Sequence, residues 1–98
     1  MSLFYYVNGV NFYSILIPIH NEKEVLEELL NKVHHYTNLG HEIIIIDDGS
    51  TDGTSQILSN VIHTKTVSLK KNMGKGAAIT KGLKVASHQK IIIFDGDL

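Results

Sequence analysis

The chain has 98 residues, of which 43% are hydrophobic and 19% charged, with a net charge of -1 and no cysteine. This composition is typical of a folded domain, and the length allows one domain at most. The lack of cysteine excludes disulfides and thiolate metal sites and is compatible with a reducing compartment. No stretch approaches the roughly 20 apolar residues that a membrane-spanning helix needs.

The chain opens with an aromatic-rich segment. Residues 1–13 carry five of the seven aromatic side chains, without a regular alternation and without the basic start of a signal peptide. We interpret residues 1–13 as a lead-in and residues 14–98 as one unit. Residues 14–17 are apolar and are followed by Pro18, which predicts a short buried strand that ends at the proline.

A helix is predicted after this strand. Asn21 and Glu24 have the spacing of a capping box, and apolar residues follow at helical intervals from position 25 to position 33. The helix is expected to end near Gly40, because glycine readily takes the left-handed conformation that closes helices.

A second strand and a second, short helix come next. Residues 43–46 are four isoleucines, the pattern of a parallel strand that is covered on both faces. The loop DDGSTDGT follows, and then Ile57, Leu58 and Val61 indicate a short helix. Residues 65–69 form a weaker third strand.

The last third of the chain repeats this order. Residues 72–76 form a glycine-containing loop, residues 77–86 a third helix, and residues 91–94 a fourth, buried strand. The inward positions of the third helix are expected to be Ile79, Leu83 and Ala86.

The alternation of strands and helices predicts a Rossmann-like, three-layer α/β/α half-domain with a mainly parallel sheet. In the usual strand order 3-2-1-4, the first, second and fourth strands are neighbours, and their carboxyl ends share one crevice. The loops after these strands are PIHNE, DDGSTD and DGDL. Their polar groups should therefore converge in space.

Two acids one residue apart, Asp95 and Asp97, end the fourth strand. Clustered carboxylates repel one another unless a cation lies between them, and oxygen donors favour Mg²⁺ or Mn²⁺ beside a phosphate. A purely structural role in a turn is the alternative. Asp47 is equally open to a contact with a nucleoside and to a structural role, whereas Asp52 is expected to cap a helix.

Lys75 lies between two glycines at a predicted helix start, which is a suitable place to bind phosphate. The surrounding residues fit neither a Walker motif nor a dinucleotide fingerprint. For His20 a packing or hydrogen-bonding role and a ligand contact are both open.

Four motifs, SILIPIHNE, HEIIIIDDGSTDGT, NMGKGAAITKGL and IIIFDGDL, occur in this order over residues 14–98. Together they resemble the N-terminal half of the family 2 glycosyltransferases with the GT-A fold, particularly the dolichyl-phosphate mannosyltransferase and polyprenyl-phosphate glycosyltransferase branch. The resemblance implies an inverting glycosyltransferase that uses a GDP- or UDP-sugar with Mg²⁺ or Mn²⁺ and an acceptor such as a polyprenyl or dolichyl phosphate.

The resemblance also implies roles for particular residues. Asp95 and Asp97 match the D-x-D pair that holds the metal and the diphosphate. No catalytic residue is expected in this chain, because the family's general base and any membrane segments would follow Leu98. The residues expected to bind the nucleotide-sugar are Pro18, His20, Glu22, Asp47, Asp48, Lys75 and Asp95.

On this basis the chain alone is expected to bind a donor without transferring sugar. We expect a cytoplasmic location, at the cytoplasmic face of a membrane if the full-length protein carries membrane segments, and no nucleic-acid partner.

Other classes of protein remain open. A receiver-type signalling domain would use Asp95 as a phosphoacceptor, although its acid pair belongs on the first strand. A haloacid-dehalogenase-like phosphatase also has a strand followed by D-x-D, but it leaves the preceding ninety residues unexplained. A non-catalytic chain that self-associates through an uncovered edge of the fourth strand is a further alternative.

Overall fold

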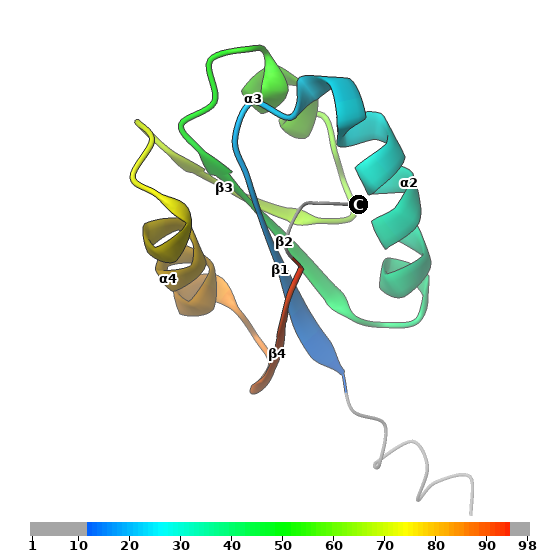
Figure 1. The fold of residues 1–98 in the computed structure, drawn as a ribbon. Helices are drawn as coiled ribbons and strands as arrows, with labels where there is room; N and C mark the ends of the chain where they lie inside the picture. Colours follow the sequence, from blue (N-terminus) through cyan, green and yellow to red (C-terminus); the bar gives the residue numbers. More distant parts are fainter. Residues whose placement is uncertain (1–11, 95–98) are drawn as a thin grey trace, which may run out of the picture.

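The computed structural model describes residues 12–94, in which strands and helices alternate. Four parallel strands form one sheet in the order β3-β2-β1-β4, with α2 and α3 on one face and α4 on the other (Figure 1). The predicted α/β/α architecture and strand order are confirmed. No helix in residues 12–94 is long and apolar enough to cross a membrane. The elements are β1 (Tyr13–Ile19), α2 (Lys23–Asn38), β2 (Glu42–Asp48), α3 (Thr54–Leu58), β3 (Lys65–Leu69), α4 (Lys75–Val85) and β4 (Lys90–Ile93).

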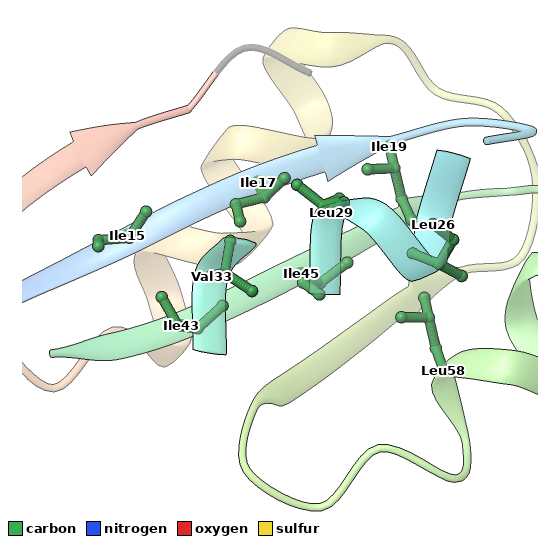
Figure 2. Packing of buried hydrophobic residues seen from close by; sticks show 9 residues of the cluster. All are labelled: Ile15, Ile17, Ile19, Leu26, Leu29, Val33, Ile43, Ile45 and Leu58. Atoms are coloured by element: carbon green, nitrogen blue, oxygen red, sulfur yellow. The ribbon is translucent and has the colours of Figure 1, made fainter. Parts of the chain in front are cut away.

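The core fills both faces of the two central strands. Alternate residues of β1 and β2 point to opposite faces, so a strand that is covered twice must be apolar at nearly every position. Figure 2 shows the face toward α2 and α3, where the strand isoleucines meet three residues of α2 and one of α3. The buried residues of this cluster are Ile15, Ile17, Ile19, Leu26, Leu29, Val33, Ile43, Ile45 and Leu58.

Strand β1 continues through Pro18 to Ile19, which corrects the expected end at the proline. The Leu16 carbonyl accepts a hydrogen bond of 2.8 Å from the Phe94 N–H, so the backbone groups of Leu16 face β4. Backbone groups two residues apart in a strand point to the same side, so the backbone groups of Pro18 also face the β4 side. The described pairing with β4 ends at Leu16, so within these residues the proline interrupts no ladder hydrogen bond.

Helix α4 has small residues at its buried positions, and of the residues expected to face inward, Ile79 and Ala86 pack against the core. It starts at Lys75, two residues earlier than expected, and its buried residues are Ala78 and Gly82. Leu83, expected to face inward, is 47% exposed. A Cβ atom at Gly82 would lie 2.8 Å from Ile46 Cδ1. The helix therefore approaches β2 too closely for a larger side chain at this position.

Two other elements differ from expectation. The short helix α3 ends at Leu58, so Val61 lies outside it. Strand β4 was expected to be buried, yet Ile92 and Ile93 are 41% and 48% exposed. The reason is that β4 is an edge strand beside β1, while the helices pack mainly on β1 and β2.

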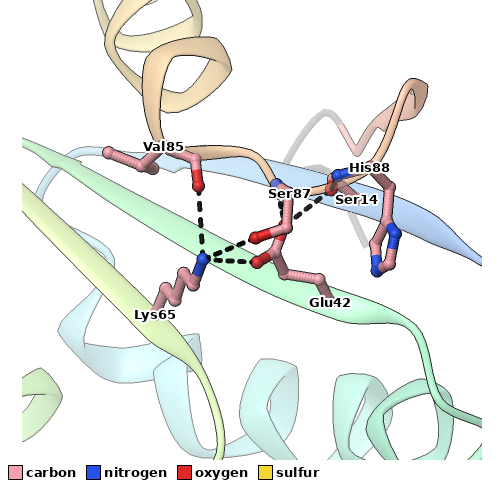
Figure 3. A network of polar contacts seen from close by, with 6 residues as sticks. All are labelled: Ser14, Glu42, Lys65, Val85, Ser87 and His88. Atoms are coloured by element: carbon pink, nitrogen blue, oxygen red, sulfur yellow. Dashed lines mark hydrogen bonds and ion pairs between the residues drawn. The ribbon is translucent and has the colours of Figure 1, made fainter.

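A polar network fastens the amino end of the sheet (Figure 3). Glu42 Oε2 pairs with Lys65 Nζ at 2.6 Å, and Glu42 Oε1 accepts hydrogen bonds from Ser14 Oγ at 2.6 Å and Ser87 N at 2.8 Å. Burial raises the pKa of Glu42, but the hydrogen bonds from Lys65, Ser14 and Ser87 outweigh it and lower the pKa to about 2. One carboxylate thus links β1, β2, β3 and the α4–β4 connection.

The network predicts a dependence of stability on pH. Because the pKa of Glu42 falls from 4.5 to about 2 on folding, its stabilisation is complete above pH 4.5 and is lost as the pH falls toward 2. We expect Glu42→Gln to lower the free energy of unfolding at pH 7 by about 1–3 kcal/mol, and to lower it less at pH 3. Urea unfolding at both values measures this.

The matched control is Glu28→Gln. Glu28 makes an exposed pair with Lys32, four residues along α2, at 3.6 Å. Such pairs contribute under about 0.5 kcal/mol. Equal effects of the Glu42 and Glu28 substitutions would contradict the role of the network.

The close packing of α4 gives a second prediction. Gly82→Val should lower the free energy of unfolding by about 1–3 kcal/mol, because the side chain must displace Ile46 and Leu16. Gly76→Val is the control, since a Cβ atom at Gly76 meets nothing within 4 Å. It should change stability by under about 0.5 kcal/mol. Equal losses in urea unfolding would contradict the close approach.

Candidate functional site

Three loops come together at the carboxyl end of the sheet, where the β1–α2, β2–α3 and β3–α4 connections lie (Figure 1). Asn21 N donates to Ser50 Oγ at 2.9 Å, which joins the first loop to the second. Met73 N donates to Asp48 Oδ1 at 2.7 Å, which joins the third loop to the end of β2. The predicted convergence of PIHNE with DDGSTD is confirmed, and the loop of Lys75 joins them.

The two acids at the end of β2 are buried and bonded to the protein. Asp47 is 1% exposed, and its oxygens accept hydrogen bonds from Ser50 N at 2.9 Å and from Ser55 Oγ. Asp48 is 5% exposed, and its oxygens accept from Met73 N and from Gly74 N at 3.0 Å. A buried carboxylate is stable only with such partners, so the burial of these acids organises the loops around them.

Gly49 lets the third loop lie directly on the second. Its φ is +69°, and a Cβ atom there would lie 2.3 Å from the backbone of Lys71 and Asn72. Any other residue would be strained in this conformation and would also displace the third loop. The glycine of the DDG sequence is thus required by the contact between two loops.

Asp52 caps two helices. Its Oδ1 accepts from Thr54 N at 3.1 Å, at the start of α3, as the sequence predicted. Its Oδ2 accepts from Lys23 N at 3.1 Å, at the start of α2. The hydrogen bond from the Thr54 hydroxyl is the main cause of a lowered pKa of Asp52. This carboxylate therefore fixes the relative position of α2 and α3.

The capping box expected of Asn21 is not formed. Asn21 has a φ of +52° and precedes α2, whose first residue is Lys23. Its Oδ1 accepts from Thr51 N at 2.7 Å, so its side chain bonds across to the second loop instead of capping its own helix. The capping role goes to Asp52, which lies about thirty residues further along the chain.

His20 lies at the centre of the three loops. Its Nδ1 is 2.7 Å from the Asp48 carbonyl oxygen, and its Nε2 is 3.2 Å from Asn21 Nδ2 and 3.2 Å from Asn72 Nδ2. Nδ1 thus contacts the end of β2, and Nε2 contacts both the β3–α4 loop and the neighbouring Asn21 of the β1–α2 loop. The sequence left two roles open for His20, and the structure shows the hydrogen-bonding one.

The other predicted residues take different places. Pro18 is buried in β1, and Glu22 lies at the N-cap position of α2, beside a surface pocket that Asn21, Val25 and Asp52 also line. Lys75 is the exposed first residue of α4. Asp95 and Asp97, the predicted metal ligands, lie outside the described residues.

Within residues 12–94 no group of three or more histidine, aspartate or glutamate side chains could hold a metal ion. The oxygens of Asp47 and Asp48 fit this finding, because backbone amides and a serine hydroxyl already bind them. The predicted Mg²⁺ or Mn²⁺ ligands, Asp95 and Asp97, follow Phe94 in the sequence, so this finding does not test that prediction.

Sequence reasoning missed several residues that build this edge. Asn72, Gly49 and Thr51 each join one loop to another, although each is unremarkable within its own loop. Short polar residues and glycines directly after three neighbouring strands were the available signal. The partners could not be assigned, because they lie 22 or more residues apart in the chain.

Comparison with known proteins identifies the class. Residues 14–98 match the model of "Glycosyl transferase family 2", so the chain belongs to this family. The predicted family is confirmed, which leaves no basis for the receiver-domain or phosphatase alternatives.

Among curated relatives, the dolichol-phosphate mannosyltransferase of Pyrococcus furiosus is 36% identical over 89 residues, which are 87% of this chain and 25% of the relative. The undecaprenyl-phosphate 4-deoxy-4-formamido-L-arabinose transferase of Pseudomonas savastanoi pv. phaseolicola is 34% identical, over 91% of this chain and 29% of the relative. The chain thus spans less than a third of the length of these relatives.

Solved structures agree on the fold. Residues 1–349 of TarS from S. aureus in complex with UDP superpose with a TM-score of 0.73 and 28% identity, over 88% of this chain and 27% of that one. A mannosyltransferase from Pyrobaculum calidifontis in complex with GDP-Man and Mn²⁺ gives a TM-score of 0.73 at 24% identity, over 87% of this chain and 27% of that one. The chain has the GT-A fold.

Proposed function

We propose that this chain forms the donor-binding part of an inverting glycosyltransferase that takes a GDP- or UDP-sugar. The observation that carries the proposal is the gathering of three polar loops at one sheet edge in a chain of glycosyltransferase family 2. TarS, which is 28% identical, has been solved in complex with UDP, and this supports a nucleotide donor.

The nucleotide would lie across the carboxyl ends of β1 and β2. Lys75 begins α4, where its charge and the helix N-terminus would both attract a phosphate. Asp47 and Asp48 would accept hydrogen bonds from the base and ribose through lone pairs that the protein leaves open. The residues that we propose to bind the nucleotide-sugar are Pro18, His20, Glu22, Asp47, Asp48, Lys75 and Asp95.

A divalent ion would complete the site. We assign Asp95 and Asp97 to Mg²⁺ or Mn²⁺, because carboxylate oxygens suit these ions and the pair matches the D-x-D motif. The ion would neutralise the charge that develops on the leaving nucleoside diphosphate.

The names of the relatives suggest the acceptor. Two of them are transferases named for dolichol phosphate and undecaprenyl phosphate, so we propose a polyprenyl or dolichyl phosphate acceptor. We propose that the activity lies at the cytoplasmic face of a membrane, where a polyprenyl phosphate acceptor would be anchored by its lipid chain.

The donor proposal predicts binding that depends on metal. In titration calorimetry, the chain should bind UDP or GDP in the presence of Mn²⁺, and Asp97→Asn should weaken binding at least about tenfold, since a charged metal ligand is lost. The control Glu27→Gln, on the exposed face of α2, should bind as the unchanged chain does. Binding without metal, or no binding of either nucleotide by the folded chain, would overturn the proposal.

We also propose that two copies associate through β4. Among residues 12–94 this strand pairs with β1 alone, and Ile92 and Ile93 are exposed beside the backbone edge that faces away from β1. An apolar strand with unpaired N–H and C=O groups pairs readily with another strand of the same kind. A second β4 offers both the apolar side chains and the hydrogen bonds that this edge lacks.

Light scattering at increasing concentration tests this association. The chain should form dimers, and Ile93→Lys should restore the monomer, because a charge at the edge opposes strand pairing. Ile62→Lys changes a residue that is 82% exposed and precedes β3, at the opposite edge, so it should leave the dimer intact. A monomer at every concentration, or equal effects of both substitutions, would contradict the interface.

A further inference from the structure

The hydrogen bonds around His20 determine which of its nitrogens carries the proton. Asn21 Oδ1 accepts from Thr51 N at 2.7 Å, and Asn72 Oδ1 accepts from Gly74 N at 3.0 Å. Both side-chain amides are thereby oriented, because an amide nitrogen cannot accept from a backbone N–H. Each must present its NH₂ group to His20 Nε2, at 3.2 Å in both cases.

Two donors that meet at Nε2 require an unprotonated nitrogen there. The proton of a neutral imidazole must then be on Nδ1, and the group that faces Nδ1 at 2.7 Å is the Asp48 carbonyl oxygen, which can only accept. These five contacts thus agree on the neutral Nδ1–H tautomer. A second proton on Nε2 would face two donors and break both contacts.

We propose that neutral His20 is a positioning residue, which holds residues 72–74 against the ends of β1 and β2 and thereby sets the place of Lys75 at the start of α4. The inference rests on the proposed nucleotide-binding function, and it deepens that function by giving His20 a role through its ring nitrogens. The Asp48 carboxylate holds the same loop through Met73 N and Gly74 N. His20 and Asp48 therefore hold this loop through separate hydrogen bonds, His20 at Asn72 and Asp48 at the next two residues.

The segments bonded to His20 carry both carboxylates and lysines. These charged residues are Glu22, Lys23, Asp47, Asp48, Asp52, Lys70, Lys71 and Lys75.

The first test reads the protein without nucleotide. Nitrogen chemical shifts from ¹H–¹⁵N NMR at pH 8 should show a protonated Nδ1 and an unprotonated Nε2 for His20. Backbone amide exchange of residues 72–74 at pH 8 should be at least about tenfold faster in His20→Phe than in the unchanged chain, because the variant lacks the ring nitrogens that hold the loop. A proton on Nε2 at pH 8 would overturn the proposal. Equal amide exchange of residues 72–74 in His20→Phe and in the unchanged chain would also overturn it.

Two variants separate hydrogen bonding from the shape of the ring. His20→Phe keeps an aromatic ring and loses both nitrogens, so the dissociation constant for UDP or GDP with Mn²⁺ should rise about tenfold at pH 8. His20→Gln supplies an oxygen that can accept from the asparagine amides, so it should bind within about threefold of the unchanged chain. Tight binding by the Phe variant with weak binding by the Gln variant would show a stacking role and refute positioning.

His35→Gln is the matched control. His35 is an exposed residue in the last turn of α2, and its substitution should change neither nucleotide affinity nor the amide exchange of residues 72–74. If the unchanged chain binds no nucleotide while the NMR results hold, the proposed function fails and the positioning of the loop stands. If nucleotide binds but loop exchange is the same in His20→Phe, the positioning role fails and the proposed function stands.

Discussion

The carboxylates of Asp47 and Asp48 at the end of β2 are buried, and the arrangement of the site follows from their requirement for hydrogen-bond donors. A buried charge without hydrogen bonds is expensive, so each oxygen of Asp47 and Asp48 must find a donor. Asp47 finds its donors in its own loop and in α3, whereas Asp48 finds its donors in the loop before α4. The end of one central strand thus positions the segments that follow β2 and β3.

The amino end of the sheet contributes to stability, whereas the proposed donor site lies at the carboxyl end. At the amino end, Glu42 and Lys65 close the sheet with an ion pair of 2.6 Å, and none of the residues proposed for the donor lies there. At the carboxyl end, loop residues bond mainly to residues of other loops, through groups such as Asn21, Asp48 and Asp52. Loops held in this way can present side chains and backbone amides to a ligand, and the β3–α4 loop also positions Lys75 at the start of α4.

Sequence patterns predicted the elements and their order well, because periodicity and strand length are local properties. The strand order and the meeting of the polar loops followed from general rules for parallel sheets. Packing was less predictable. Gly82 faces the core and Leu83 does not, since the distance between α4 and β2 is set by the whole sheet. Ile92 and Ile93 are apolar and exposed, because burial depends on which helices lie over an edge strand.

The candidate site shows the same limit at the level of single bonds. Asn21 had the spacing of a helix cap, and Asp52 had the chemistry of one. Only the folded chain decides that Asp52 caps α2 and that Asn21 bonds to Thr51. From the sequence, Asp47 was equally open to a nucleoside contact and to a structural role, and the family resemblance assigned both Asp47 and Asp48 to the nucleotide.

The hydrogen bonds of Asp47 and Asp48 show the structural role, and they limit how a nucleotide could contact these two side chains. Each carboxylate oxygen retains lone pairs beyond the bond that it accepts. A nucleotide must reach those lone pairs through side chains that are 1% and 5% exposed. The more accessible groups at this edge are Lys75 and the ring of His20. Recognition of a donor here would therefore depend first on how firmly the buried acids hold the loops that carry the exposed groups.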